Sequence, residues 1–415
     1  MPDWVQDAIW WQVHPLGFVG AERDAVPTVS HRLPRITGWL DHLLALGCNG
    51  LALGPVFASQ THGYDTVDHL RIDPRLGDEQ DVRDLVTAAH DRGVRVLLDG
   101  VFNHVGRAHP AFTDPARRHW FRWEGDRPAV FEGHDALVAL DHSQPDVVAY
   151  VVEVMCHWLE RGVDGWRLDA AYAVPPAFWA QVLPAVRERF PDVYVVGEVI
   201  HGDYAGIVGA STVDAVTQYE LWQGLWHGIA EANLFETAHA LQRHDGFLDA
   251  FAPWTFVGNH DVTRIVDQVG RPEHLPHALV VWATVGGTPA VWSGDEFGWH
   301  GIKEHRAGGD DAIRPEFPAD PLSVAGGEVL ALHQELIGLR RRHRWLHRAR
   351  TTQLHLTNTA LVYRTAADGE ALVVALNLAD APAVVPASGT VLAGQATPRG
   401  RGLELPAHGW AVLSP

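Results

Sequence analysis

The chain has 415 residues, enough for one barrel of about 250 residues with additional elements, or for two or three ordinary domains. Hydrophobic residues make up 47% and charged residues 20% of the sequence, a balance that excludes disordered and collagen-like proteins. The formal net charge of −19 excludes the basic surface of a nucleic-acid binder and disfavours binding to anionic lipid, so neither nucleic acid nor a membrane is expected as a partner.

Short apolar runs alternate with amphipathic runs as far as about residue 340. The apolar runs are typical of buried strands, and they are expected at Ala8–Val13, Gly50–Leu53, Val94–Leu98, Gly165–Leu168, Val193–Gly197, Ala215–Tyr219, Thr255–Val257 and Ala290–Trp292. Helical patterns between them cover Leu33–Leu46, Gln80–Arg92, Pro145–Glu160, Pro176–Arg189 and His277–Thr284. Eight strands that each lead into a helix predict an α/β fold, the (β/α)₈ TIM barrel.

The pattern changes after a last helix expected at Glu328–Arg342. Alternating runs at Ala360–Thr365 and Ala371–Leu376 flank an Asp368-Gly369 turn, and Gly409–Leu413 follows near the end. Such runs joined by tight turns predict a C-terminal antiparallel β-sandwich domain. The expected domains are a barrel of residues 1–104 and 140–345, a short insertion after strand three at 105–139 (here called domain B), and a β domain at 346–415.

The cysteines and the N-terminal residues indicate a cytoplasmic protein. The first residues have neither the basic nor the apolar region of a signal peptide, and no apolar run reaches the length of a membrane span. Cys48 and Cys156 are the two cysteines, and both lie in or beside apolar stretches. We therefore expect buried free thiols in a reducing compartment.

Acidic residues end four of the expected strands. They are Asp99 in Asp99-Gly-Val-Phe-Asn103-His104, Asp169 in Gly165-Trp-Arg167-Leu-Asp169, Glu198 after Gly197, and Asp261 in Asn259-His260-Asp261. One carboxylate at such a position could simply cap a helix. Four that converge on the mouth of one barrel indicate a catalytic site, because the loops at that end carry the chemistry of the fold.

Several carboxylates beside an arginine suit the cleavage of a glycosidic bond. One carboxylate attacks or stabilises the oxocarbenium-like centre, and a second, kept protonated, protonates the leaving oxygen. Arg167 stands two residues before Asp169, on the same face of the strand, and is expected to hold Asp169 ionised as the nucleophile. Glu198 has no basic neighbour in the sequence and is expected to be the proton donor.

At these residues the sequence resembles the α-amylase superfamily, glycoside hydrolase family 13. The resemblance rests on six motifs in order: His62-Gly-Tyr64-Asp65, Asp99–His104, Leu140–Asp146, Gly165–Asp169, Glu198, and Asn259-His260-Asp261. The segments Phe178-Trp179, Pro191–Tyr194 and Thr217–Leu221 are similar to the branch of cyclomaltodextrinases, neopullulanases and related α-glucosidases. That branch usually has an additional N-terminal β domain, whereas the barrel here is expected to begin within the first ten residues. Its dimer is therefore not carried over, and the oligomeric state stays open.

The resemblance implies a retaining mechanism. Asp169 would form a glycosyl-enzyme, Glu198 would act as general acid and then as general base, and Asp261 would stabilise the transition state. The residues implied to bind or order the sugar are Tyr64, Asp99, His104, Arg167 and His260. Of these, Tyr64 would pack on the ring, and the two histidines would bind its hydroxyls.

The sequence departs from the family pattern where calcium is concerned. Ala170-Ala-Tyr-Ala173 replaces the Ala-Lys-His that follows the nucleophile in many extracellular α-amylases. Asn103 could still bind Ca²⁺, but further oxygen ligands are not evident in domain B. We therefore expect no metal and no cofactor. Ala170 itself resembles the residue found in enzymes that cut α-1,4 bonds.

Three functions remain open on the sequence. The first is a retaining hydrolase of α-glucosidic bonds, with α-1,4 bonds favoured, in small maltooligosaccharides or related α-glucosides. The second is a transglycosylase or isomerase that uses the same glycosyl-enzyme. The third is a non-catalytic sugar-binding homologue, disfavoured because Asp169, Glu198 and Asp261 are all present.

Overall fold

The computed structural model describes residues 1–306 and 308–415 of the chain. In this part of the chain an eight-stranded parallel sheet has the order β12-β11-β10-β5-β2-β1-β14-β13. Its strands are β1 (Trp10–Val13), β2 (Gly50–Leu53), β5 (Arg95–Gly100), β10 (Gly165–Leu168), β11 (Tyr194–Gly197), β12 (Ala215–Val216), β13 (Trp254–Phe256) and β14 (Thr288–Trp292). A parallel bridge from Thr217 to Trp254 joins the two ends of the sheet. The sheet is therefore a closed barrel, which confirms the predicted fold class.

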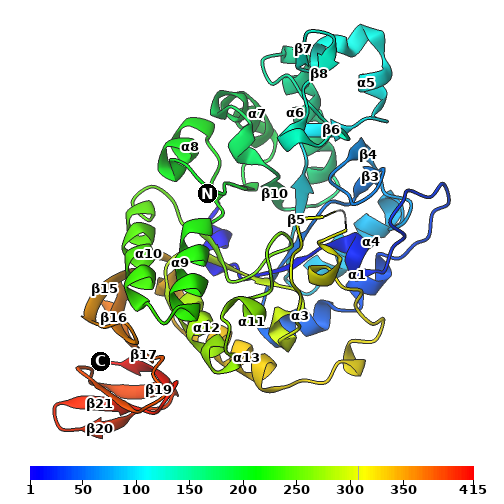
Figure 1. Ribbon diagram of the computed structural model, residues 1–415. Coiled ribbons are helices and arrows are strands. Elements are labelled where there is room, and N and C mark those ends of the chain that lie inside the picture. The colour runs from blue at the N-terminus through cyan, green and yellow to red at the C-terminus, as the bar shows by residue number, and fades with distance from the viewer. Residues whose placement is uncertain (307) are drawn as a thin grey trace.

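Helices surround the barrel (Figure 1). They are α1 (Pro15–Phe18), α2 (Pro34–Thr37), α3 (Leu40–Leu46), α4 (Glu79–His90), α6 (Pro145–Leu159), α7 (Pro176–Arg189), α8 (Tyr204–Ser211), α9 (Tyr219–Ala230), α10 (Leu234–Phe247), α11 (Ile265–Gln268), α12 (Leu275–Thr284) and α13 (Glu328–Arg342). The single helix expected at Leu33–Leu46 is divided at Gly38 and Trp39. Trp39 is buried there, and its indole N–H donates to the carbonyl of Pro318.

One boundary differs in a way that matters for function. The strand expected at Ala215–Tyr219 ends at Val216, and Tyr219 instead begins α9. The Gln218 side chain accepts a hydrogen bond from the N–H of Leu221, so it caps this helix. The apolar pattern predicted that the strand continues through Tyr219, but the side-chain cap at Gln218 begins a helix there instead. As a result Tyr219 lies at the mouth of the barrel.

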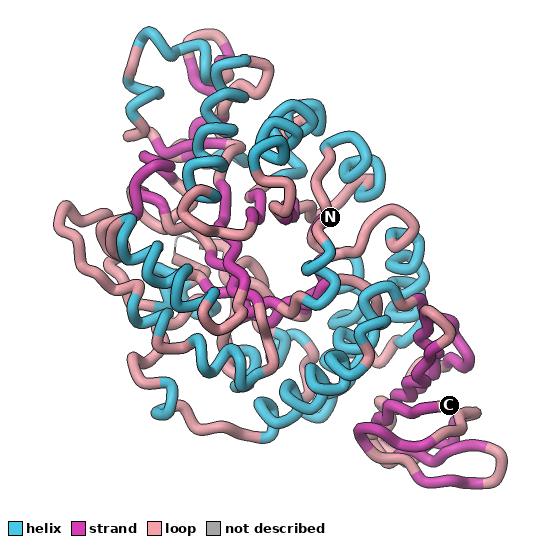
Figure 2. Tube along the Cα trace, turned by 180° about the vertical axis from the view of Figure 1, so that it is seen from behind, coloured by secondary structure: helices cyan, strands magenta, loops and turns pink. Residues whose placement is uncertain are grey.

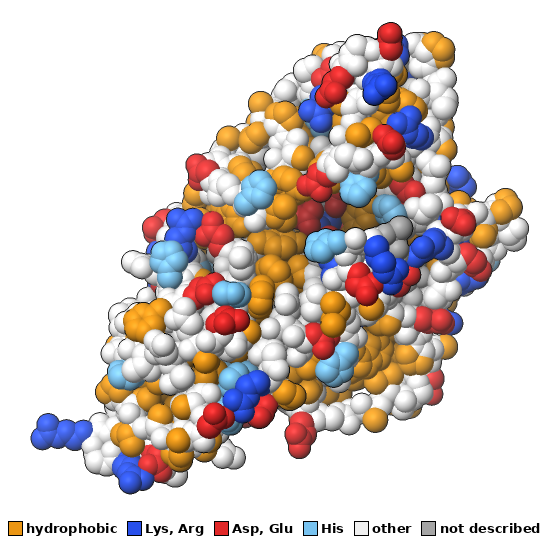
Figure 3. Space-filling view, in the orientation of Figure 1, with side chains coloured by type: hydrophobic (Ala, Val, Ile, Leu, Met, Phe, Trp, Pro, Cys, Tyr) orange, Lys and Arg blue, Asp and Glu red, His pale blue; other side chains and the backbone are white. Residues whose placement is uncertain are grey.

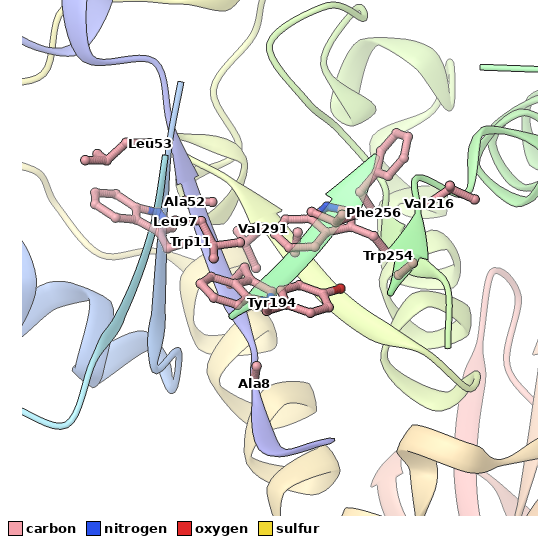
Figure 4. Close-up of a cluster of buried hydrophobic side chains, with 14 of the residues drawn as sticks. Ala8, Trp11, Ala52, Leu53, Leu97, Tyr194, Val216, Trp254, Phe256 and Val291 are labelled. Atoms are coloured by element: carbon pink, nitrogen blue, oxygen red, sulfur yellow. The ribbon is translucent and has the colours of Figure 1, made fainter. Parts of the chain in front are cut away.

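Tryptophan fills much of the core. Trp10, Trp11, Trp158 and Trp166 are fully buried. Inside the barrel, Trp10 stacks on Trp254 with the ring centroids 5.4 Å apart, and Figure 4 shows the aromatic side chains that gather there. Most of the 17 tryptophans in the chain are thus explained by packing rather than by ligand binding.

Two smaller units flank the barrel on opposite sides (Figures 1 and 2). In domain B, β6 (His104–Gly106) pairs with β9 (Leu137–Ala139). Between these two strands the chain forms α5 (Pro110–Thr113) and the short strands β7 (Trp123–Glu124) and β8 (Arg127–Pro128). A further pair, β3 (Phe57–Ser59) and β4 (Thr66–Ile72), lies between β2 and α4.

The C-terminal domain is antiparallel, as expected. One sheet contains β15 (Arg350–Leu356), β16 (Ala360–Ala367), β17 (Glu370–Asn377), β22 (Trp410–Ser414) and β19 (Thr390–Gly394). The other contains β18 (Ala383–Val385), β21 (Gly402–Leu405) and β20 (Thr397–Arg399). Cys48 and Cys156 are buried free thiols, which confirms the expectation for both. Among the residues described, none of the helices has the length and apolar character needed to cross a bilayer.

Candidate active site

The carboxyl ends of the central strands bring three acidic residues together. In the parallel register Arg167 lies opposite Asp99, and Leu168 lies opposite Gly197, so Asp169 and Glu198 follow at neighbouring positions. All three carboxylates are buried. Figure 3 shows a hollow near the middle of this face, with acidic atoms at its floor and histidine side chains around its rim.

Arg167 connects the three carboxylates. Its Nη1 atom lies 2.8 and 2.7 Å from the oxygens of Asp99 and 3.3 Å from Oδ1 of Asp169. Its Nη2 atom lies 2.5 Å from Oε1 of Glu198. Glu198 therefore has a basic partner in space although none stands beside it in the sequence, because the register of β10 and β11 brings Arg167 to it. One guanidinium cannot neutralise three carboxylates, so the cluster favours retention of a proton.

Arg167 favours the ionised form of Asp169, as expected, but its positive charge does not outweigh burial and the neighbouring acids. Burial and the nearby charge of Glu198 raise the pKa of Asp169 well above its ordinary value, although Arg167 opposes this shift. Burial likewise raises the pKa of Asp99 despite its contact with Arg167. The single positive charge is shared among the three acids. Asp169 thus ionises at a cost, which makes its carboxylate reactive toward a developing cation.

This shift predicts a stability gain for Asp169→Asn at neutral pH. A carboxyl whose pKa is raised by folding begins to destabilise the protein as the pH rises above its pKa in the unfolded chain. The destabilisation is complete once the pH exceeds its pKa in the folded protein. The variant should melt about 2 °C higher than the wild type at pH 7, and this difference should vanish near pH 4. Thermal unfolding across pH measures it, with Asp41→Asn, an exposed site, as the control. A variant that is less stable than the wild type at pH 7 would contradict the electrostatic argument.

Glu198 is held by a second set of contacts. Its Oε2 accepts a hydrogen bond from the N–H of Ala170 at 3.0 Å, and its Oε1 accepts one from the Tyr219 hydroxyl at 3.3 Å. Tyr219 in turn accepts a bond from Nδ2 of Asn259 at 2.8 Å. Ala170 has a φ of 45°, a left-handed conformation that costs a non-glycine residue energy, and this geometry turns its N–H toward Glu198.

Asp261 lies at the rim among positive groups. Its carboxylate is 2.7 Å from Nη2 of Arg314 and 3.8 Å from Nζ of Lys303. The Nε2 atom of His260 lies 2.9 Å from Oδ2, within ion-pair distance but without the alignment of a hydrogen bond. Burial raises the pKa of Asp261, but these three groups outweigh it and hold the pKa well below its ordinary value. Asp261 is thus an anion throughout the neutral range.

Tyr64 and His260, both expected to contact the sugar, lie side by side. Their rings stack with centroids 5.5 Å apart and an interplanar angle of 8°. The Tyr64 hydroxyl lies 3.3 Å from Oδ2 of Asp99, and the Arg314 guanidinium lies over the same ring at 5.7 Å. Gln12 contacts Nδ1 of His260 at 3.4 Å, which fixes that imidazole from inside the barrel.

His104 is buried beside domain B. Its Nε2–H donates to the carbonyl of Tyr64 at 3.0 Å, and its Nδ1 lies 3.1 Å from Nδ2 of Asn103. The Phe131 ring of domain B stacks on it at 4.9 Å, and Glu132 accepts a hydrogen bond from Tyr172 at 2.6 Å. Both nitrogens of His104 are thus used within the protein, and the observed contacts position the Tyr64 loop.

Sequence reasoning missed the roles of Lys303, Arg314, Tyr219 and Phe131. Arg314 stands four residues after Asp310, a spacing that cannot be distinguished from an ordinary helical ion pair. Tyr219 lay within a recognised motif but was expected in a strand. Phe131 belongs to an insertion with no periodic pattern, so nothing in the sequence directs it toward the site.

Asn103, the residue that could bind Ca²⁺, is buried beside the Leu140–Asp146 motif. Its Oδ1 atom is buried without a partner, as one metal ligand would be in a structure without ions. Calcium takes about six to eight oxygen ligands. The nearby motif acid Asp141 instead accepts hydrogen bonds from Ser143 and Gln144. Within residues 1–306 and 308–415, no group of three His, Cys, Asp or Glu side chains with metal-ligand spacing includes a residue near Asn103.

A closed parallel barrel whose mouth holds neighbouring buried carboxylates, a third acid and an arginine has the groups that cleavage of a glycosidic bond requires. Residues 12–321 match the family model of the alpha-amylase catalytic domain, and residues 347–413 match a domain of unknown function, DUF3459. The chain belongs to the α-amylase family of glycoside hydrolases.

Relatives of this chain lie in the branch that the motifs indicated. A cyclomaltodextrinase from a Bacillus species is 32% identical over 82% of this chain and 67% of its own length. Neopullulanase 2 of Thermoactinomyces vulgaris is 30% identical over 94% of this chain and 73% of its own. The structure of cyclic α-maltosyl-(1→6)-maltose hydrolase from Arthrobacter globiformis has a TM-score of 0.85 over the full length of both chains at 24% identity, a likeness of fold.

Proposed function

We propose that this protein is a retaining hydrolase that cleaves α-1,4-glucosidic bonds in small maltooligosaccharides. The observation that carries the proposal is the attachment of Asp169 and Glu198 to one guanidinium at the mouth of the barrel. This arrangement keeps two carboxyl groups close together while only one positive charge supports them. The pair can therefore exist with one member protonated and the other ionised, as the retaining reaction requires.

In the first step an oxygen of Asp169 bonds to the anomeric carbon while the bond from that carbon to the glycosidic oxygen breaks. Glu198 gives its proton to the leaving oxygen. In the second step Glu198 takes a proton from water, the water oxygen bonds to the anomeric carbon, and Asp169 leaves. The N–H of Ala170 and the hydroxyl of Tyr219 orient Glu198 in both steps.

The other site residues support the sugar around this centre. Asp261 is anionic and partly exposed at the rim, so it can bind hydroxyls and stabilise the positive charge that develops on the ring. Tyr64, held by Asp99 and stacked on His260, offers an aromatic surface to the same ring. His104 maintains the Tyr64 loop. Arg167, which is held by Asp99, fixes the positions of the Asp169 and Glu198 carboxylates.

Two observations support a short substrate. Domain B is small, and its residues Phe131 and Glu132 reach the mouth of the barrel beside His104 and Tyr172. The curated relatives reported above are named cyclomaltodextrinase and neopullulanase, enzymes of α-glucans. The buried free thiols support a cytoplasmic location, where such soluble oligosaccharides are available.

A product profile tests this function. The protein is incubated with maltotriose, maltopentaose, panose, isomaltose, trehalose and soluble starch, and the anomer first released is identified by proton NMR. We expect the α-anomer, with maltotriose and maltopentaose cleaved fastest. Release of the β-anomer would contradict the retaining mechanism, and preference for starch or for α-1,6 bonds would contradict the substrate.

Transfer to a sugar hydroxyl is the second outcome that the same intermediate allows. The hydroxyl of a second oligosaccharide can take the place of water once Asp169 carries the glycosyl group. Products longer than the substrate at high maltotriose concentration would identify this activity, and their absence would support hydrolysis alone.

We propose that the activity requires no metal ion. The carboxylate of Asp141, in the motif that packs beside Asn103, already accepts hydrogen bonds from Ser143 and Gln144. Activity on maltotriose should therefore change by less than about twofold after dialysis against EDTA, because Asn103 is left without the carboxylate of Asp141 as a partner for an ion. Turnover assays before and after dialysis, with and without added Ca²⁺, measure this. A loss that Ca²⁺ restores would overturn the proposal.

A further inference from the structure

A basic cavity lies at the end of the barrel opposite the catalytic carboxylates. Its walls come from the segment before β1, the turn before β14, the end of α13 and the short helix η9 (Arg344–Arg348). Figure 4 shows Ala8, at this end of the barrel, and Leu53, at the carboxyl end of β2, on opposite sides of the core. The cavity is therefore distinct from the active site.

The charged residues that line the cavity are Arg340, Arg341, Arg344 and Asp7. Asp7 is already paired with Arg344. Formally, the lining carries two more positive than negative charges, in a chain whose net charge is −19. This local excess of positive charge is opposite in sign to the net charge of the chain, and it favours the binding of an anion.

Arg340 shows how strongly this charge is buried. Its side chain is 6% exposed, and it donates to the carbonyls of Ala283, Val285 and Gly287 at 2.6 to 3.0 Å. These bonds use three of the five N–H donors of a guanidinium. In the described part of the chain the hydrogen-bond partners of Arg340 are these carbonyls and no carboxylate pairs with it, and burial lowers its pKa to about 9. An uncompensated buried cation is costly, and a bound anion would relieve that cost.

His347 supplies an independent sign of a ligand. It lines the same cavity, is 6% exposed, and its Nε2 atom is buried without a hydrogen-bond partner. Burial, followed by the charge of Arg340, lowers the pKa of His347 to about 4, so its imidazole is neutral at pH 7. A neutral imidazole can donate one N–H without adding charge.

We propose that this cavity binds a phosphate dianion, either free or as the terminal group of a phosphate monoester. Its volume of about 110 Å³ suits one tetrahedral oxyanion with a few water molecules and excludes an oligosaccharide. Guanidinium groups match phosphate oxygens in geometry, and the excess of two positive charges balances a dianion. The anion would meet Arg340, Arg341 and the Nε2 atom of His347.

Calorimetric titration of the full chain tests the proposal. Inorganic phosphate is titrated at pH 7.5 and constant ionic strength, with chloride as the reference anion and glucose 1-phosphate and glucose 6-phosphate in parallel. We expect saturable phosphate binding that chloride does not reproduce. Tighter binding of one ester would identify a sugar phosphate as the occupant, and tighter binding of inorganic phosphate would identify the free ion, each supporting the phosphate site.

Variants locate the binding. Arg341→Gln combined with Arg344→Gln should weaken phosphate binding at least about tenfold, because one guanidinium that would contact the anion and a second positive charge of the lining are lost. Arg342→Gln is the control, since it removes a positive charge from the same helix as Arg341 but from a residue that does not line the cavity. It should bind within about twofold of the wild type, as should the active-site variant Asp169→Asn. Unchanged affinity in the double variant, lost affinity in Asp169→Asn, or no binding beyond that of chloride would overturn the proposal.

Discussion

Replacement of Asp169 by Ala is expected to lower kcat/KM on maltotriose by at least about 10⁴-fold, or about 5.5 kcal/mol of transition-state stabilisation. The reason is that the variant has no group that can bond to the anomeric carbon. Azide added with α-glucosyl fluoride, a substrate with a good leaving group, can enter the space left by the carboxylate. The product should then be β-glucosyl azide, because azide attacks from the face that Asp169 occupied.

Glu198→Ala is the matched variant. It retains Asp169, so α-glucosyl fluoride can still form the glycosyl-enzyme, and azide then attacks from the opposite face to give α-glucosyl azide. The two stereochemical results together assign the nucleophile and the acid–base residue. Turnover of Asp169→Ala within tenfold of the wild type, or the same azide anomer from both variants, would contradict these roles.

Replacement of Arg167 by Met is expected to destabilise the fold by about 3–5 kcal/mol at pH 7, because it leaves three buried carboxylates without their cation. The loss should shrink as pH falls, since protonation removes the repulsion among these acids. Activity should fall as well, because Asp169 and Glu198 are no longer held together. Urea unfolding at pH 7 and at pH 5 measures the first effect.

Arg92→Met is the control for this experiment. Arg92 also pairs with an aspartate, but its partner Asp41 is exposed, and surface ion pairs contribute only about 0–1 kcal/mol. We expect its loss to be small and insensitive to pH between 5 and 7. A loss at Arg167 equal to that at Arg92 would show that Arg167 does not hold the carboxylate cluster together.

The local patterns of the sequence were sufficient for the architecture. Buried runs such as Gly50–Leu53 and Gly165–Leu168 coincide with β2 and β10, because a strand enclosed by helices has apolar residues on both faces. The helix ends were also accurate where the pattern was strong, as at α7 and α13. The expected strand that included Tyr219 failed because a side-chain cap at Gln218, a local contact, overrode hydrophobicity.

The sequence by itself determined which acids reach the mouth of the barrel, because position at the end of a parallel strand specifies that location. Only the tertiary structure decided which charges surround each acid there and therefore in which direction its pKa is shifted. Arg167 and Glu198 are 31 residues apart and meet through the register of β10 and β11, and Asp261 meets Arg314 across a loop. Charge interactions depend on distance in space and on burial, and neither follows from spacing along the chain.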